Sequence, residues 1–326
     1  MSPACHLIHR PRAGGSRPAS APPGHGADRA ERFSLAGDMP TPPPPFDDRP
    51  GRLYDPLAAV ELIRQAAEFI SRRFFGQPAG RPAICYRLDL AVTDVPAWRV
   101  GERVARLTAS LTARPALELH RAPRGLALTA TLRIDDRPCA TVTARLLLQG
   151  TAARRGGPAL AQLTEPAGEP GEPVAPYAVG GRDPAAVLVH DPSGAPGGPL
   201  SVRIAGPRWP WAADGAASQA LLLEALRQTA VFAAHQAHAL APPRALLAGL
   251  RCRLPGFAVP RPPLRAAAVP GPLARDAGGR VLAPVALVVT RGGEPVAEAE
   301  VSVAQDAGRD RTGVRRGNKA WLEPRD

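Results

Sequence analysis

The stretch Leu221–Ala230, LLLEALRQTA, places a glutamate and an arginine three residues apart in an otherwise almost entirely apolar run. The same spelling occurs earlier, where Glu61–Ala67 reads ELIRQAA. The pattern Glu-x-x-Arg-Gln thus appears twice, and its glutamates, at positions 61 and 224, lie 163 residues apart. A chain of 326 residues has the length of about two ordinary domains. The repeat therefore indicates two similar halves.

The second copy lies in a helix predicted from Ala217 to His238, which Pro242 and Pro243 follow. On a helical wheel, one arc of about 100° holds a polar stripe, and most of the remaining circumference is apolar. The stripe consists of Glu224, Arg227, Gln228, His235 and His238. A surface helix shows the inverse arrangement, so this helix is expected to be mostly enclosed by its own domain.

Two interpretations of the polar stripe are open. It can be the one solvated edge of the helix, in which case Glu224 and Arg227 form a pair worth a few tenths of a kcal/mol. Alternatively, each helix carries its ionic groups to an interface with the other half, where buried charges need partners and usually mark a site. The repetition favours the second interpretation, because solvated edges have no reason to match residue by residue.

An earlier helix is predicted in the first half. Asp55 and Pro56 supply its N-cap and first turn, and the pattern runs to Phe75 and ends at Gly76. Its apolar stripe consists of Val60, Ile63, Ala67, Ile70 and Phe74. The side chains of Glu61, Arg64 and Glu68 fall together on the flank of this stripe.

Short β-like segments follow each helix, so the sequence predicts an α+β fold in which an antiparallel sheet accompanies each helix. Two hairpins are expected, with turns at Asp135–Cys139 and Arg291–Pro295. The expected strands are residues 84–92, 103–113, 117–120, 126–134 and 140–149, then 187–190, 200–205, 247–254, 264–269, 281–290 and 296–304, with a hint of another at 32–36.

Composition shifts suggest the domain boundaries. An N-terminal domain is expected over residues 1–150, with a partly irregular, Pro- and Gly-rich stretch at 11–50. A linker at 151–172 leads to a second domain at 173–304, and residues 305–326 are expected to form a polar tail.

The net charge of +12 does not by itself indicate a nucleic-acid partner. Lys319 is the only lysine among 41 basic residues, which is typical of a GC-rich genome, and the arginines are scattered along the chain. No apolar run approaches the roughly 18 residues that span a bilayer. No signal peptide is apparent. A cytoplasmic protein without a nucleic-acid or membrane partner is expected.

No cofactor or metal site is expected. His235 and His238 have a spacing that suits a metal, but no carboxylate or cysteine completes the site, so they are interpreted as C-terminal helix histidines favoured by the dipole. The His190–Pro192 segment is interpreted as turn chemistry. The four cysteines form no CxxC pair and are expected to be reduced and structural. Nucleotide-binding and serine-hydrolase motifs are absent from the sequence.

Three segments resemble the A-factor biosynthesis (AfsA-like) family of tandem hotdog proteins. Arg52–Ala66 is similar to that family's "RYDPLLxAExIRQA", and Leu221–Ala230 is similar to "LLLEAARQAA". Val179–Leu188 resembles "VGRxxPxDVVL", which opens the second half. The resemblance spans about residues 6–304. It implies a pseudo-dimeric double hotdog, in which each antiparallel sheet wraps a long helix, with the possibility of a higher oligomer.

The resemblance also implies a function in actinobacterial secondary metabolism. Members of the family are expected to transfer a β-ketoacyl group from acyl carrier protein to the hydroxyl of dihydroxyacetone phosphate or a similar acceptor. The product is a precursor of a γ-butyrolactone or butenolide autoregulator. The family's functional residues fall on Glu61, Glu224 and Arg227.

A division of labour is hypothesised for these groups. A glutamate made more basic by burial, most simply Glu61, takes the proton from the attacking hydroxyl. Arg227 stabilises the thioester oxyanion or grips the acceptor phosphate, and Glu224 orients Arg227. Arg64 is a second anion contact, and Gln65 and Gln228 complete the substrate-binding set.

The sequence also departs from the family pattern. Where the family carries "FDHPxDHVPGM", this chain has Pro210–Ala220, which lacks both histidines, and "GHQF" is replaced by Gly80–Ala83. These departures leave a changed substrate or a lost activity open. Three further functions are also compatible with the sequence: a thioesterase- or dehydratase-like enzyme on the same scaffold, a non-catalytic protein that binds an acyl chain or a signal, and, remotely, a nucleic-acid-binding protein.

Overall fold

A computed structural model describes residues 6–10, 30–39, 53–75, 83–101, 103–119, 122–148, 171–195, 198–205, 215–254, 264–276 and 278–306. These ranges contain two long helices, α1 (Pro56–Phe74) and α2 (Gly215–His238). The strands of the first half are β1 (His6–Arg10), β2 (Glu31–Asp38), β3 (Ala83–Val92), β4 (Arg106–Leu119), β5 (Ala122–Ile134) and β6 (Arg137–Leu148). Those of the second half are β7 (Val189–Gly194), β8 (Leu200–Ile204), β9 (Ala245–Arg253), β10 (Leu264–Pro270), β11 (Ala274–Arg275), β12 (Val281–Arg291) and β13 (Glu294–Gln305).

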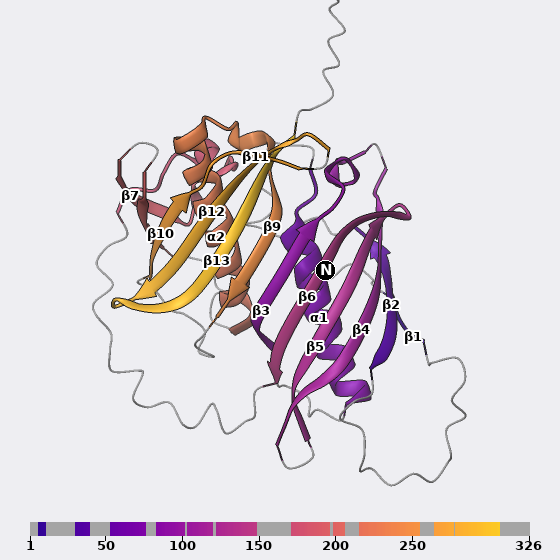
Figure 1. Ribbon diagram of the computed structural model, residues 1–326. Helices are drawn as coiled ribbons and strands as arrows, with labels where there is room; N and C mark the ends of the chain where they lie inside the picture. The colour runs from indigo at the N-terminus through magenta and orange to yellow at the C-terminus, as the bar shows by residue number, and fades with distance from the viewer. Residues whose placement is uncertain are drawn as a thin grey trace, which may run out of the picture.

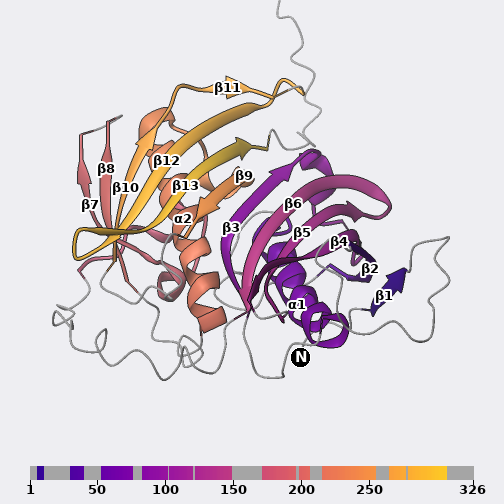
Figure 2. The ribbon, with the colours of Figure 1, turned by 60° about the horizontal axis from the view of Figure 1, so that its bottom comes forward.

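The described strands form one antiparallel sheet that runs through both halves. Its order is β1-β2-β4-β5-β6-β3-β9-β13-β12-β10-β8-β7, and β11 pairs with β12. The junction is the pairing of β3 with β9, in which Leu88 lies opposite Cys252. Both helices lie on the same side of this sheet, as Figures 1 and 2 show, and the core fills the space between them and the strands. The two halves therefore share a continuous backbone hydrogen-bond ladder.

The first helix begins and packs as the sequence predicts. The Asp55 carboxylate accepts a hydrogen bond of 2.8 Å from the backbone N–H of Leu57, and Pro56 occupies the first turn. Ala67 and Ile70 are completely buried. Phe74, at the last turn, is partly exposed and meets the ring of Phe33 from β2 edge-on at 5.0 Å.

The second helix is enclosed, as its inverted pattern predicts. Ala225, Leu226, Ala230 and Ala234 have no exposed surface. None of the helices in the described ranges has a stretch long and apolar enough to cross a membrane.

Both predicted hairpins are confirmed. Strands β5 and β6 turn through Asp135 and Asp136, both with positive φ, and β12 and β13 turn through Gly292 and Gly293. Two-residue turns of this hand match the right-handed twist of the flanking strands, and Asp and Gly tolerate the backbone conformation they require.

Several boundaries differ from the prediction. Residues 117–119 are not a separate strand but continue β4. Pro115 is tolerated there because β2 pairs with β4 only up to Ala113, so beyond that residue none of the described strands needs the missing N–H on that side. Strands β1 and β11 were not predicted, because β1 holds only two apolar residues, Leu7 and Ile8, and β11 is only two residues long.

The expected boundary between second domain and tail is also displaced. Strand β13 continues through Gln305, and the carboxylate of Asp306 receives two hydrogen bonds from the Arg99 guanidinium of the first half. Most of the expected irregular stretch at 11–50, nearly all of the linker and the tail beyond residue 306 lie outside the described residues.

The described cysteines should be inert in the folded protein. Burial raises the pKa of the Cys85, Cys139 and Cys252 thiols to about 12, and all three are free. Because a raised pKa favours the neutral thiol, these groups should not react with a thiol reagent at mildly alkaline pH in a Cys5→Ser variant. All three should react in guanidinium chloride. Rapid labelling of the native variant would show that the strands around them open.

Candidate functional site

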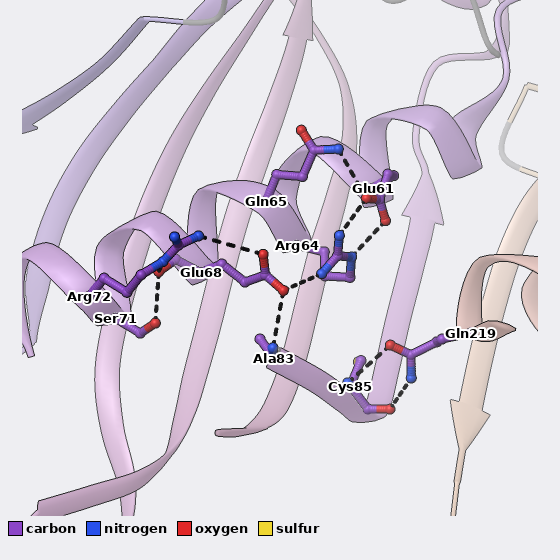
Figure 3. A network of polar contacts seen from close by, with 9 residues as sticks. All are labelled: Glu61, Arg64, Gln65, Glu68, Ser71, Arg72, Ala83, Cys85 and Gln219. Carbon is purple, nitrogen blue, oxygen red and sulfur yellow. Dashed lines mark hydrogen bonds and ion pairs between the residues drawn. The ribbon is translucent and has the colours of Figure 1, made fainter. Parts of the chain in front are cut away.

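The first copy of the repeated motif forms a closed cluster on α1 (Figure 3). The Arg64 guanidinium donates to both oxygens of Glu61, with Nε to Oε2 at 2.7 Å and Nη2 to Oε1 at 2.6 Å. The Gln65 amide donates to Glu61 Oε1 at 3.0 Å. Residues three and four apart on a helix are neighbours, so the spacing Glu-x-x-Arg-Gln places all three polar groups together.

The second copy on α2 repeats these bonds atom for atom. Arg227 Nε donates to Glu224 Oε2 at 2.7 Å, and Arg227 Nη2 donates to Glu224 Oε1. Gln228 Nε2 donates to Glu224 Oε1 at 3.0 Å. The identical spelling of the two halves therefore produces an identical local structure, a bidentate carboxylate–guanidinium pair with an amide on one oxygen.

The surroundings of the two clusters differ. In the second, the side chains of Glu224, Arg227 and Gln228 are at most 5% exposed. In the first, the side chain of Glu61 is 35% exposed and Gln65 lies at the surface. The interpretation of the stripe as a solvated edge is therefore wrong for α2. Glu61 is only partly buried, so it is less enclosed than the hypothesis for its role as the base assumed.

The second cluster holds a loop of its own half. Arg227 Nη1 donates to the carbonyl of Val179 at 3.3 Å. The Gln228 side chain bonds two backbone groups, donating to the carbonyl of Ala186 at 2.9 Å and accepting from the N–H of Leu188 at 2.8 Å. The motif thus anchors residues 179–188 to α2, a contact between segments about 40 residues apart that the wheel alone could not show.

The first cluster faces the beginning of β3 and includes a second carboxylate. Arg64 Nη1 donates to Glu68 Oε1 at 2.5 Å, and the same oxygen accepts from the N–H of Ala83 at 3.1 Å. Arg72 approaches Glu68 only to 3.8 Å and is 47% exposed, so water screens its charge. Glu61 and Glu68 therefore share one guanidinium. The second cluster has no counterpart, because Val231 occupies the position that matches Glu68.

Both guanidinium groups stay charged. Burial by itself lowers the pKa of Arg64 and of Arg227. The hydrogen bonds and charges of Glu61 and Glu68 outweigh this for Arg64, and those of Glu224, with the charge of Asp55, outweigh it for Arg227, so both pKa values are raised. Asp55 belongs to the first half, so a charge of one half raises the pKa of an arginine in the other.

A buried side chain that the sequence interpretation missed joins the halves beside the first cluster. The Gln219 amide of α2 accepts from the N–H of Cys85 at 3.1 Å and donates to the Cys85 carbonyl at 2.6 Å (Figure 3). Strand β9 pairs with β3 only from Arg87 onward. Gln219 therefore satisfies backbone groups that lie beyond the end of that ladder. A lone glutamine near a helix start gives no signal of such a partner.

Replacing Gln219 with leucine should lower the free energy of unfolding by about 2–4 kcal/mol, because two buried backbone groups of Cys85 would lose their partners. Urea unfolding followed by circular dichroism measures this change. The same substitution at Gln236, exposed on the same helix, should have little effect. Equal losses at the two positions would contradict a specific role for the Gln219 bonds.

The remaining candidate groups have structural contacts. His235 Nδ1 lies 2.9 Å from the carbonyl of Leu240, and His238 Nε2 lies 2.8 Å from the carbonyl of Gly271. His190 Nδ1 lies 2.8 Å from the carbonyl of Gly171. The turn interpretation of His190–Pro192 is wrong, because these residues lie within β7, where Asp191 has a positive φ at an irregularity in the pairing with β8.

A pocket of about 240 Å³ lies between the C-terminal half of α2 and the β7–β8 hairpin. Its wall includes Leu200, Phe232 and Ala233, and neither motif contributes to it. No hydrogen bond between described residues joins the two clusters directly, so an interface at which the ionic groups of both helices meet stays a prediction. Residues 80–82 and 210–214, where the sequence departs from the family pattern, lie outside the described ranges.

Comparison with known proteins identifies the scaffold. The family model for the A-factor biosynthesis hotdog domain (AfsA) matches residues 23–148 and again residues 163–304. No curated protein gives a significant match. Among solved structures, the pyran synthase domain from module nine of the sorangicin pathway is 14% identical, covers 91% of this chain and 100% of its own, and has a TM-score of 0.50, which shows the fold alone.

Two further structures are similar at lower scores. The 12:0-ACP thioesterase from Umbellularia californica is 12% identical, covers 85% of this chain and 94% of its own, and has a TM-score of 0.47. The tesB protein MAP1729c from Mycobacterium avium subs paratuberculosis is 15% identical, covers 84% and 92%, and has a TM-score of 0.46.

Proposed function

This chain belongs to the A-factor biosynthesis hotdog domain family, and on that premise we propose that it transfers a β-ketoacyl group from acyl carrier protein to the hydroxyl of dihydroxyacetone phosphate or a similar acceptor. The product is the precursor of a γ-butyrolactone or butenolide autoregulator. The observation that carries this proposal is the pair of identically bonded carboxylate–guanidinium–amide clusters on the two central helices of a hotdog protein. Acyl transfer needs a base and a cationic group at one place, and each cluster supplies both.

We also propose that the chain is a pseudo-dimeric double hotdog, with units at residues 1–150 and 173–304 joined by a linker at 151–172. The two separate matches of the family model, one per half, support this division. The pairing of β3 with β9 also supports it, because these are corresponding strands, each the first after the long helix of its half.

The reaction has a definite balance of atoms. The acceptor hydroxyl oxygen attacks the thioester carbonyl carbon and forms a C–O bond while its proton passes to a carboxylate. The C–S bond then breaks, and the carrier's sulfur leaves and takes up the proton. A base must be open to the hydroxyl, and a donor must face the oxygen that becomes negative.

We assign the base to the first cluster. Glu61 is 35% exposed, so a hydroxyl can reach it, whereas Glu224 is buried. The first cluster also holds two carboxylates, Glu61 and Glu68, on the one guanidinium of Arg64.

The arginines fit the role of anion contacts. The bonds of Arg64 to Glu61 and Glu68 use three of its five N–H donors, and those of Arg227 to Glu224 and Val179 also use three. Among the described residues, two donors of each have no acceptor, and we propose that they bind a substrate oxygen or phosphate. Glu224 holds Arg227 through two bonds and so sets its direction.

Thioester hydrolysis is the second candidate reaction, and a specific observation favours it. Gln65 and part of Glu61 face solvent, so water could replace the acceptor hydroxyl. Incubation with β-ketoacyl carrier protein, with and without dihydroxyacetone phosphate, separates the two reactions. An acylated acceptor detected by mass spectrometry supports transfer. Free β-keto acid released equally in both cases supports hydrolysis, and an intact thioester in both cases supports a protein that only binds.

A further inference from the structure

A row of arginines crosses the outer face of the sheet where the two halves meet. Arg87 of β3 lies directly opposite Arg145 of β6 on one side and Arg253 of β9 on the other. Arg114 of β4 continues this line, because Ala127 of β5 lies opposite both Arg114 and Arg145. We call Arg145, Arg87 and Arg253 the arginine row.

Figure 1 looks onto the outer face of the sheet, the side opposite α1 and α2. The burial of the chain neighbours puts the arginine row on this face. Successive residues of a strand point to opposite sides. The chain neighbours Ala144 and Leu146 of Arg145, and Leu88 of Arg87, are buried on the helix side. Arg87 is 43% exposed, and Arg145 and Arg253 are exposed.

Like charges placed directly opposite on neighbouring strands destabilise a sheet. The nearby carboxylates compensate only part of the row. Asp89 lies 3.4 Å from Arg87 and bonds Arg251, which in turn bonds Glu300, while Glu298 of β13 stands opposite Arg253. Within the part of the chain that the structure describes, the guanidinium groups of Arg145 and Arg253 have no hydrogen bond or ion pair. An anionic surface placed on the row would relieve this repulsion.

The arginine row lies at the same end of β3 as the first cluster. Arg87 is two residues from Cys85, whose backbone Gln219 holds, and Ala83, a further two residues back, donates to Glu68 of the cluster (Figure 3). A partner seated on the row is thus next to the strand end that borders Glu61, Arg64 and Glu68. Surface and site are connected by one short piece of backbone.

We propose that the arginine row is the docking surface for the acidic face of the protein that carries the acyl thioester. This inference rests on the proposed function, which requires a protein-bound substrate at the first cluster. A second copy of this chain is a poor occupant, because the chain carries a net charge of +12 and copies repel one another. Exposed charges such as these arginines mainly speed the association of two proteins, and they lose this effect at high salt.

The test compares two double variants that change the net charge equally. The first, Arg145→Gln with Arg253→Gln, removes the two arginines of the row that have no partner among the described residues. The matched control, Arg32→Gln with Arg265→Gln, removes two exposed arginines on the same outer face, from β2 and β10 near the far edges of the sheet. Each variant is assayed with β-ketoacyl carrier protein and with the same acyl group on N-acetylcysteamine, and binding of the carrier protein is measured by fluorescence anisotropy.

We expect the first variant to raise both KM and Kd for the carrier protein about tenfold, with kcat and turnover of the small thioester unchanged. The control should behave as the unmodified protein, and the difference should disappear at high salt. Equal losses in the control, or an equal loss with the small thioester, would overturn the docking surface. So would carrier binding that is unaffected by the first variant, or a competing affinity for DNA that depends on the same two arginines.

Failure of the proposed function has a different result. If the unmodified protein turns over neither thioester but binds the carrier protein through Arg145 and Arg253, the docking surface stands and the acyl-transfer proposal fails. If the unmodified protein turns over both thioesters and the first variant behaves like the control, the acyl-transfer proposal stands and the docking surface fails.

Discussion

Replacing Glu224 with glutamine should lower the free energy of unfolding by about 3–5 kcal/mol, which makes it one of the most damaging single changes in the chain. Glu224 is 1% exposed and supplies both acceptors for the buried guanidinium of Arg227. Glutamine keeps the shape but removes the charge, so Arg227 remains charged without its counter-ion at a buried position. The loss is measured by urea or guanidinium unfolding at fixed pH.

The repeat provides a matched control for this prediction. The same substitution at Glu61 removes the same local bonds from Arg64, but this side chain is 35% exposed, so the expected loss is below about 1 kcal/mol. Removing both buried charges together, by Glu224→Leu with Arg227→Met, should recover most of the stability. Equal losses for the two glutamine variants would show that burial does not distinguish the clusters.

Activity should depend strongly on Glu61, although its substitution costs little stability. Glu61→Gln is expected to lower kcat about 10²–10⁴-fold in the transfer assay, because it removes the proposed proton acceptor, while KM changes little. Its small effect on stability makes the loss of activity interpretable. The measurement is the initial rate of thiol release from β-ketoacyl carrier protein in the presence of the acceptor.

The control for Glu61 is Glu294→Gln, which removes an exposed carboxylate from the β12–β13 turn and should leave kcat unchanged. Full activity of Glu61→Gln would refute its role as the base. In that case, Glu68→Gln becomes the informative variant, since Glu68 is the other carboxylate on Arg64. If Glu61→Gln, Glu68→Gln and Glu294→Gln lose activity equally, the loss comes from the changed net charge of the protein and not from a particular carboxylate.

The elements that the sequence predicted are those set by short-range interactions. Asp55 and Pro56 fix the start of α1, and the Asp135–Asp136 and Gly292–Gly293 pairs fix the two hairpin turns, because each depends on backbone conformations a few residues apart. The spacing Glu-x-x-Arg-Gln likewise predicts the contacts within each cluster. The extension of β4 through Pro115 was missed, because it depends on where a distant strand, β2, stops.

The candidate site was predictable only in part, and the limit is physical. The sequence by itself determined that two helices carry the same three polar groups and that these groups bond one another, since helical spacing decides this. Only the tertiary structure decided that one cluster is buried against residues 179–188 while the other stays partly open beside β3. It also decided that Gln219 reaches Cys85 and that three arginines align across β6, β3 and β9. Burial and strand register depend on segments far apart in the chain, and identical local sequences meet different surroundings.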